Sequence, residues 1–331
     1  MQPIYLTGHS RPVRKVMFNF DGDLLFTCSD DGNICMYNTF DCARVGVFNM
    51  KEAIKSMDVT KDSKYVLAAG TTFGFVIFNT LNGEELVRTQ IPVRNIQVKH
   101  IEFGMGDQKF LVLYDHNKKS YVRVYDFKDA LDKKPDGLKE IAGPQDHIIT
   151  QASWGPLNKT MYIATDKGRF LIHDWENDKV VIQSEVHKSE IFSFTVTYDH
   201  TMLITCSRDG QAKMLHPKTL VPVRIFDFVK PCRSACISPL FDSVEYQKFH
   251  VLLAGGQDAR EVTTTQATEG GFGIKLMSII YNQHLAEITG HFGTVHTLAF
   301  SPDGFTFASG SEDGYVHLHK FLPEYFTKKF E

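Results

Sequence analysis

The sequence has few of the features that mark a membrane protein, a secreted protein or a nucleic-acid-binding protein. No apolar run approaches the length of a membrane span, and the N-terminus MQPIYLTGHS lacks the basic region and apolar stretch of a signal peptide. The formal net charge is only -3, with 36 Lys and Arg against 39 Asp and Glu. Because this balance creates no field that would attract a phosphate backbone, we expect neither direct nucleic-acid binding nor membrane association.

Cysteine is also sparse, and its spacing excludes the usual cross-linked frameworks. No C-x-x-C pair is present, as a structural zinc site would require. The cysteines lie mostly within apolar patterns typical of strands: Cys28, Cys35, Cys42, Cys206, Cys232 and Cys236. We therefore expect reduced thiols, a cytoplasmic location and no disulfide framework.

Signatures of catalysis are missing as well. The sequence contains no G-x-x-x-x-G-K-[ST] loop, no G-x-G-x-x-G fingerprint and no G-x-S-x-G elbow. His317 and His319 alternate on one expected strand, with His291 and His296 nearby, so a metal cluster is an alternative to simple packing. We interpret the alternation as packing and predict a protein without catalytic residues, bound metal or cofactor.

What the sequence does contain is an internal repeat. The opening segment has Gly8-His9, an apolar run, Asp21-Gly22, a second run, a turn that ends at Gly32 and a third run. The segment from Gly290 to His319 follows the same order, and five weaker copies lie between them. Short apolar runs separated by Asp-Gly turns indicate antiparallel meanders, and units of this length are typical of WD40-type propeller blades. The sequence predicts an all-β fold, a single seven-bladed WD40 β-propeller over residues 1–331.

The chain ends indicate how the ring closes. The last repeat supplies three strands, and residues 3–6 can supply the fourth, so the N-terminal strand is expected to join the last blade. A short aromatic tail, 321–331, follows. Residues 128–143 are expected to lengthen a junction between two blades. Sustained helical periodicity is nearly absent from the sequence, and its best candidate is 127–131, at the start of this connection. Residues 255–273 replace the tight turn of the penultimate blade with a long loop.

Several histidines occur at the starts of repeats. In WD40 blades such a histidine belongs to a buried network with a strand Ser or Thr and a turn Asp. The expected sets are His9 with Thr27 and Asp31, His187 with Thr205 and Asp209, and His291 with Ser309 and Asp313. We therefore interpret these histidines as structural rather than catalytic. The Trp that normally completes the network is absent from every blade, so the network is expected to be weakened in this chain.

Several passages go beyond the general WD40 pattern. SWGP from Ser153, GGQDAREVTTT from Gly255 and GHFGTVHTLAFSPDG from Gly290 resemble the family of the i subunit of eukaryotic translation initiation factor 3. The resemblance spans the whole chain in order. It implies a scaffold subunit of a hetero-oligomeric complex that supports scanning and start-codon selection on the small (40S) ribosomal subunit. It also implies binding to the C-terminal helix of the b subunit and to a segment of the g subunit.

The resemblance also suggests two partner-binding positions. Asp199 matches an acidic partner contact of the family in the first turn of the fifth blade, although an aspartate there also simply forms a turn. His216 occupies the place of a second family acid. The departure at His216 indicates that the charge pairing differs in this chain.

Two alternatives remain at this stage. One is a different cytosolic WD40 adaptor, such as a signalling scaffold or a substrate scaffold of a ubiquitin ligase. The other is an enzymatic propeller, which would need a metal or a polar cluster in its central channel.

Overall fold

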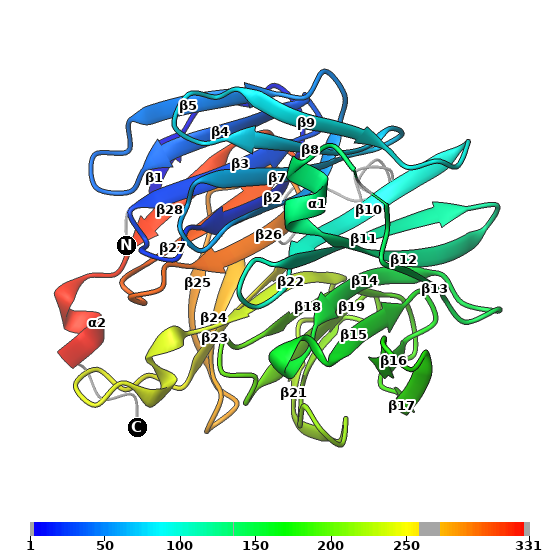
Figure 1. Ribbon diagram of the computed structural model, residues 1–331. Coiled ribbons are helices and arrows are strands. Elements are labelled where there is room, and N and C mark those ends of the chain that lie inside the picture. The colour runs from blue at the N-terminus through cyan, green and yellow to red at the C-terminus, as the bar shows by residue number, and fades with distance from the viewer. Residues whose placement is uncertain (1–2, 135, 258–271, 328–331) are drawn as a thin grey trace.

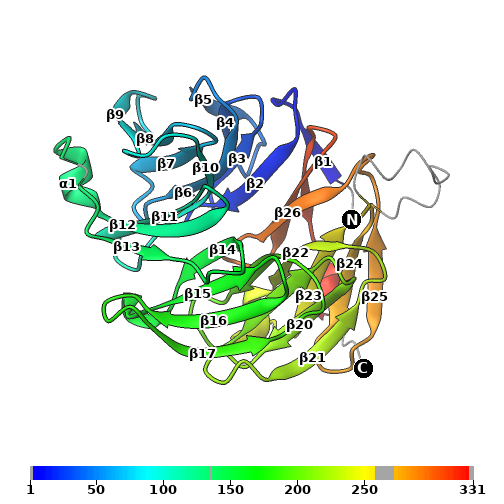
Figure 2. The same ribbon diagram turned by 90° about the vertical axis from the view of Figure 1, so that its right-hand side faces the viewer.

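The computed structural model describes residues 3–134, 136–257 and 272–327. Within these residues the strands form seven antiparallel sheets of four strands each. The sheets are arranged as blades around a central axis, as Figures 1 and 2 show from two directions. The prediction of an all-β, seven-bladed propeller is therefore confirmed.

Each blade runs from an innermost to an outermost strand, and the first four blades follow the chain in order. Blade 1 contains β2 (Val13–Phe18), β3 (Leu24–Ser29), β4 (Asn33–Asn38) and β5 (Arg44–Asn49). Blade 2 contains β6 (Ile54–Val59), β7 (Tyr65–Gly70), β8 (Gly74–Asn79) and β9 (Glu85–Gln90). Blade 3 contains β10 (Ile96–Phe103), β11 (Lys109–His116), β12 (Lys119–Asp126) and β13 (Lys139–Ala142). Blade 4 contains β14 (Ile149–Trp154), β15 (Thr160–Thr165), β16 (Arg169–Asp174) and β17 (Lys179–Glu185).

The remaining blades follow the same plan, except that the last one uses both ends of the chain. Blade 5 contains β18 (Ile191–Val196), β19 (Leu203–Ser207), β20 (Gln211–Leu215) and β21 (Pro222–Asp227). Blade 6 contains β22 (Cys232–Ile237), β23 (His250–Gly255), β24 (Ile274–Ser278) and β25 (His284–Ile288). Blade 7 contains β26 (Val295–Phe300), β27 (Thr306–Ser311), β28 (Val316–Lys320) and β1 (Pro3–Leu6). Two 3-10 turns, Pro156–Asn158 and Pro239–Asp242, follow β14 and β22.

Burial explains the composition of these strands. The second strand of a blade is covered on both faces by neighbouring blades, so strands such as β23 and β19 are buried throughout. Outermost strands such as β17 are largely exposed and tolerate charge. The tight turns need glycine: Gly168 has a φ of +80°, and a Cβ there would lie 2.1 Å from the His187 carbonyl oxygen.

The ring closes as the sequence predicts. Neighbouring innermost strands contact one another all the way round, including β26 with β2. β1 pairs antiparallel with β28, from Pro3 opposite His319 to Leu6 opposite Val316 (Figure 1). This pairing supplies the fourth strand of blade 7 and covers the edge that β28 would otherwise expose.

The prediction that residues 128–143 lengthen a blade junction is wrong. The segment begins in α1 (Phe127–Leu131) and ends in β13, which pairs with β12 as the outermost strand of blade 3. Since an outermost strand buries little, the sequence KEIA has only Ile141 in the core and therefore looks like a connection. The one candidate helix of the sequence does form, as α1, and the Asp126 side chain caps it by accepting hydrogen bonds from two backbone amides.

The other irregular segments lie near the end of the chain. Residues 255–273 connect the second and third strands of blade 6, as expected, but 258–271 lie outside the described residues. After β28 the chain forms α2 (Pro323–Thr327), and the tail beyond it, 328–331, is also outside them. Within the described ranges, no helix is long and apolar enough to cross a membrane.

Candidate protein-binding site

The structure brings together all three expected histidine sets. In blade 1, His9 Nε2 lies 2.8 Å from Thr27 Oγ1, and His9 Nδ1 lies 3.1 Å from Asp31 Oδ2. The corresponding distances in blade 5 are 2.9 Å from His187 to Thr205 and 3.0 Å from His187 to Asp209. In blade 7 they are 2.8 Å from His291 to Ser309 and 3.1 Å from His291 to Asp313.

These sets join each blade to the chain segment before it. Asp209 accepts the Lys188 amide at 3.1 Å and the Gln211 amide at 3.0 Å, so one carboxylate joins the turn between β19 and β20 to the segment that precedes β18. Burial alone would raise the pKa of Asp209, but contacts with His187 and with these amides lower it to about 2. For His9 the effect of burial has the opposite sign and is the largest one: burial lowers the pKa of the ring, although the nearby Asp31 carboxylate raises it. A buried ring that is hydrogen-bonded on both nitrogens serves structure rather than catalysis.

The histidines of blade 7 pack rather than converge on one point. The His291 and His317 rings are stacked, and His319 lies edge-on to His317 with ring centroids 5.9 Å apart. In the part of the chain that the structure describes, no group of three metal-binding side chains is found.

Asp199 lies in the first turn of blade 5, between β18 and β19. Its Oδ1 accepts the Thr197 hydroxyl at 2.6 Å and the Thr201 amide at 3.1 Å, and its Oδ2 accepts the Thr201 hydroxyl at 2.7 Å. Although partial burial would raise its pKa, these hydrogen bonds lower it, so the carboxylate is charged at neutral pH. Thr60 and Asp62 make the same turn contact in blade 2, and this geometry is therefore that of a turn former.

Asp199 also lines a groove, in which Asp62 of the blade 2 turn has no part. The groove has a volume of about 390 Å³ and crosses the ends of the innermost strands of blades 5, 6 and 7. Its apolar lining comes from Val196, Ile237, Pro239, Phe241, Leu298, Phe300 and Pro302. Two carboxylates, Asp199 and Asp242, also line it. An apolar groove with acidic residues suits a segment that has apolar anchors and basic neighbours.

Tyr198 forms part of the groove and is held from the opposite side of the ring. Lys61, in the first turn of blade 2, places its Nζ 3.3 Å from the Tyr198 hydroxyl and 4.1 Å from the centroid of the Phe20 ring. Tyr198 itself is 72% exposed. One wall of the groove is therefore positioned by cation–π and hydrogen-bond contacts across the mouth of the central channel.

His216 is not brought into the groove. Its Nδ1 lies 3.3 Å from both the Lys218 and the Thr219 amides, so it closes the third turn of blade 5. Asn38 does the same in blade 1, where it accepts the Phe40 amide at 2.8 Å. The first and third turns of a blade lie on the same face of the ring because successive strands are antiparallel. His216 thus shares a face with Asp199 but has a turn-forming role of its own.

Most of the groove residues were not singled out by the sequence. Val196, Ile237 and Phe300 end three separate innermost strands and look there like ordinary core positions. Asp242 lies in the 3-10 turn after β22. Only the three-dimensional ring brings these segments, which are spread over about 100 residues of the chain, to one surface.

Comparison with known proteins settles the family. The model of the EIF3I family matches residues 1–331. The chain belongs to the EIF3I family. It is 35% identical to eukaryotic translation initiation factor 3 subunit I of Dictyostelium discoideum over 328 residues, covering 98% of this chain and 96% of that protein. It is 30% identical to the protein of that name from Homo sapiens and 29% identical to the one from Xenopus laevis, with full coverage of each chain.

Membership in the EIF3I family confirms the resemblance found in the sequence. The agreement extends over whole chains, so it covers every blade as well as the segment 255–273. A translation initiation factor subunit, rather than an unrelated WD40 adaptor, is the class of protein that the comparisons support.

Proposed function

We propose that this chain is a non-catalytic scaffold subunit of the cytoplasmic initiation factor 3 complex. In this proposal it binds the b subunit through that subunit's C-terminal helix and also binds the g subunit. Through the complex it supports scanning and start-codon selection on the small ribosomal subunit. The observation that carries the proposal is the preformed apolar groove beside Asp199 on a closed, rigid ring.

The shape and chemistry of the groove favour a helical segment. Its apolar lining spans three blades, so a row of side chains on one helix face can enter it. Asp199 and Asp242 then face basic residues that flank the apolar anchors and fix the register of the helix. Asp199 needs no rearrangement to do this, since Thr197 and Thr201 already hold its carboxylate.

Binding of a labelled peptide from the C-terminus of the b subunit tests the proposal. Asp199→Asn removes the charge but keeps an oxygen that can accept from the Thr197 hydroxyl and the Thr201 amide, two of the three turn hydrogen bonds. It should weaken binding by roughly fivefold at low salt. Asp199→Lys should weaken it by more than about tenfold. Asp62→Asn is the matched control, because Asp62 makes the same turn contact in blade 2 without lining the groove.

The outcome separates the two roles of Asp199. Equal affinities for the Asp199→Asn, Asp62→Asn and unmodified proteins would mean that Asp199 only forms its turn. Failure of the unmodified chain to bind the peptide, or to co-purify with the other subunits of the complex, would overturn the proposed function.

A further inference from the structure

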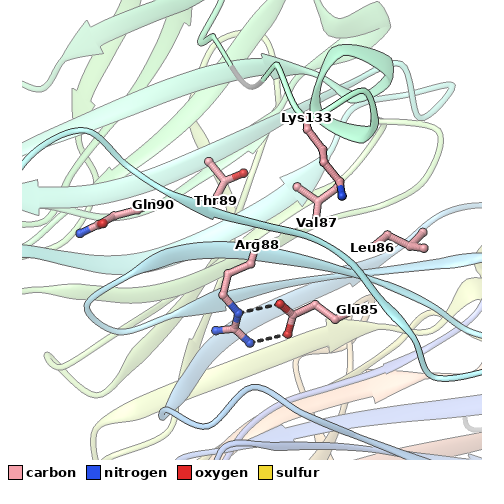
Figure 3. A pocket seen from close by; sticks show the side chains of 7 residues that line it. All are labelled: Glu85, Leu86, Val87, Arg88, Thr89, Gln90 and Lys133. Atoms are coloured by element: carbon pink, nitrogen blue, oxygen red, sulfur yellow. Dashed lines mark hydrogen bonds and ion pairs between the residues drawn. The ribbon is translucent and has the colours of Figure 1, made fainter.

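A second cavity lies on the outer rim of the propeller, on blade 2. It has a volume of about 520 Å³ and is lined by the six residues of β9, Glu85 to Gln90, together with Lys133 (Figure 3). Six consecutive strand residues extend for about 20 Å. The cavity is therefore a trough that follows the strand along its length, and we call it the β9 trough.

The backbone of β9 is free to pair along this trough. On its inner side β9 pairs with β8, from Gly74 opposite Gln90 to Phe78 opposite Glu85. No other strand of the described residues pairs with β9. In an antiparallel pair, alternate residues direct their N–H and C=O groups away from the partner, so the free edge of β9 offers a ladder of donors and acceptors.

The insertion in blade 3 forms a fixed wall beside this edge. α1 contacts β9, and its Phe127 and Leu131 pack against the core cluster that contains Val87. The chain then turns sharply at Lys133, which has a φ of +58° and whose amide donates to the Ala130 carbonyl at 3.1 Å. Figure 3 shows the Lys133 side chain reaching from the end of α1 toward Val87. The wall is thus in place before any ligand arrives.

The charge of the trough is unbalanced. Arg88 is neutralised by Glu85, with distances of 2.7 Å from Nε to Oε1 and 2.5 Å from Nη2 to Oε2. Lys133 is exposed and makes no ion pair with any described residue. One positive charge is therefore left over beside an unpaired strand edge, where a carboxylate would be favoured.

We propose that the β9 trough binds an extended, acidic segment of another subunit of the initiation factor, which pairs with β9 as a fifth strand of blade 2. Backbone pairing supplies affinity, and a carboxylate of the segment lies against Lys133. The inference rests on the proposed function only in taking the segment from the same complex. It concerns a different blade from the Asp199 groove.

Hydrogen–deuterium exchange of the assembled complex and of the isolated chain tests this. On assembly, the amides of residues 85–90 should become protected, whereas those of β17, the outermost strand of blade 4, serve as an internal reference. If the chain assembles into the complex while residues 85–90 exchange as fast as before, this inference is wrong and the proposed function stands.

Charge reversal then tests the chemistry of the bound segment. Peptides tiled over the other subunits identify the binder by protection of residues 85–90. Lys133→Glu should weaken the binding of that peptide by about tenfold at low salt, whereas Lys134→Glu, which does not line the trough, should change it by less than about twofold. A helical binder, or one equally insensitive to both variants, would contradict an acidic added strand.

Discussion

The ring of His291 lies flat against the ring of His317, with centroids 3.7 Å apart and an interplanar angle of 6°. His317 also meets the Tyr5 ring edge-on, with centroids 4.6 Å apart. Since Tyr5 belongs to β1, the stack joins the N-terminal strand to the start of blade 7. Burial, and then the neighbouring His291, lower the pKa of His317 from 6.5 to about 4.

This stack predicts a loss of stability in mild acid. The unfolded chain takes up a proton at His317 near pH 6.5, but the folded chain does so only near pH 4. The free energy of unfolding should therefore fall as the pH drops from about 6.5 to about 4. Thermal unfolding at several pH values measures this. His317→Phe keeps a flat ring against His291 and cannot titrate, so its unfolding temperature should fall less over the same range. If the unfolding temperatures of the variant and of the unmodified protein fall equally with pH, groups other than His317 control the pH dependence of stability.

The histidine networks predict a contrast between two blade starts. His187 is hydrogen-bonded to Thr205 and Asp209, whereas His147, at the start of blade 4, has an Nδ1 without a partner among the described residues. His187→Ala removes the hydrogen bonds of the ring to Thr205 and Asp209 and should lower the free energy of unfolding by about 1–3 kcal/mol. His147→Ala should change it by less than about 0.5 kcal/mol. Denaturant unfolding gives both values, and similar losses would contradict a structural role specific to the network.

Ring closure predicts the effect of removing the N-terminal strand. Deletion of residues 1–6 removes the partner of β28 and the buried side chain of Leu6. The open edge should lower the unfolding temperature and cause concentration-dependent self-association, which light scattering detects. Ile4→Thr, at an exposed position of β1, retains the strand and serves as the control. A monomeric deletion variant with an unchanged unfolding temperature would show that β1 contributes little.

The architecture could be predicted from the sequence because its signals are local. Asp-Gly turns and short apolar runs recur in each blade, and the unpaired run of residues 3–6 identified the closing strand. β13 could not be predicted in the same way. An outermost strand buries little, so KEIA carries no alternating pattern and was assigned to a connection.

The binding surfaces were harder to predict because they arise between distant segments. Asp199 was found only through family resemblance, since its hydrogen bonds to Thr197 and Thr201 are those of any Asp turn. Val196, Ile237 and Phe300 look like core residues until the ring places three strand ends together. The β9 trough depends on an insertion that comes from the neighbouring blade.

The aromatic tail predicts a link between stability and the groove. The Tyr325 hydroxyl lies 2.6 Å from His250 Nδ1, and the Tyr325 ring stacks on Phe321 with centroids 4.1 Å apart. Phe321 in turn lies parallel to Phe300, which lines the groove, at 6.1 Å. Tyr325→Ala should therefore lower the free energy of unfolding by about 3 kcal/mol and also weaken binding of the b-subunit peptide, because Phe300 loses the support behind it.

Leu322, three residues before Tyr325, provides the control for this prediction. Its side chain is 55% exposed, so Leu322→Ala truncates a side chain near Tyr325 without opening a cavity and should cost less than about 0.5 kcal/mol. Denaturant unfolding and peptide titration of both variants give the two quantities separately. If Tyr325→Ala loses stability but binds the peptide with full affinity, the tail supports the seam between blades 6 and 7 without shaping the groove. If both variants behave alike, the buried stack contributes no more than the exposed leucine.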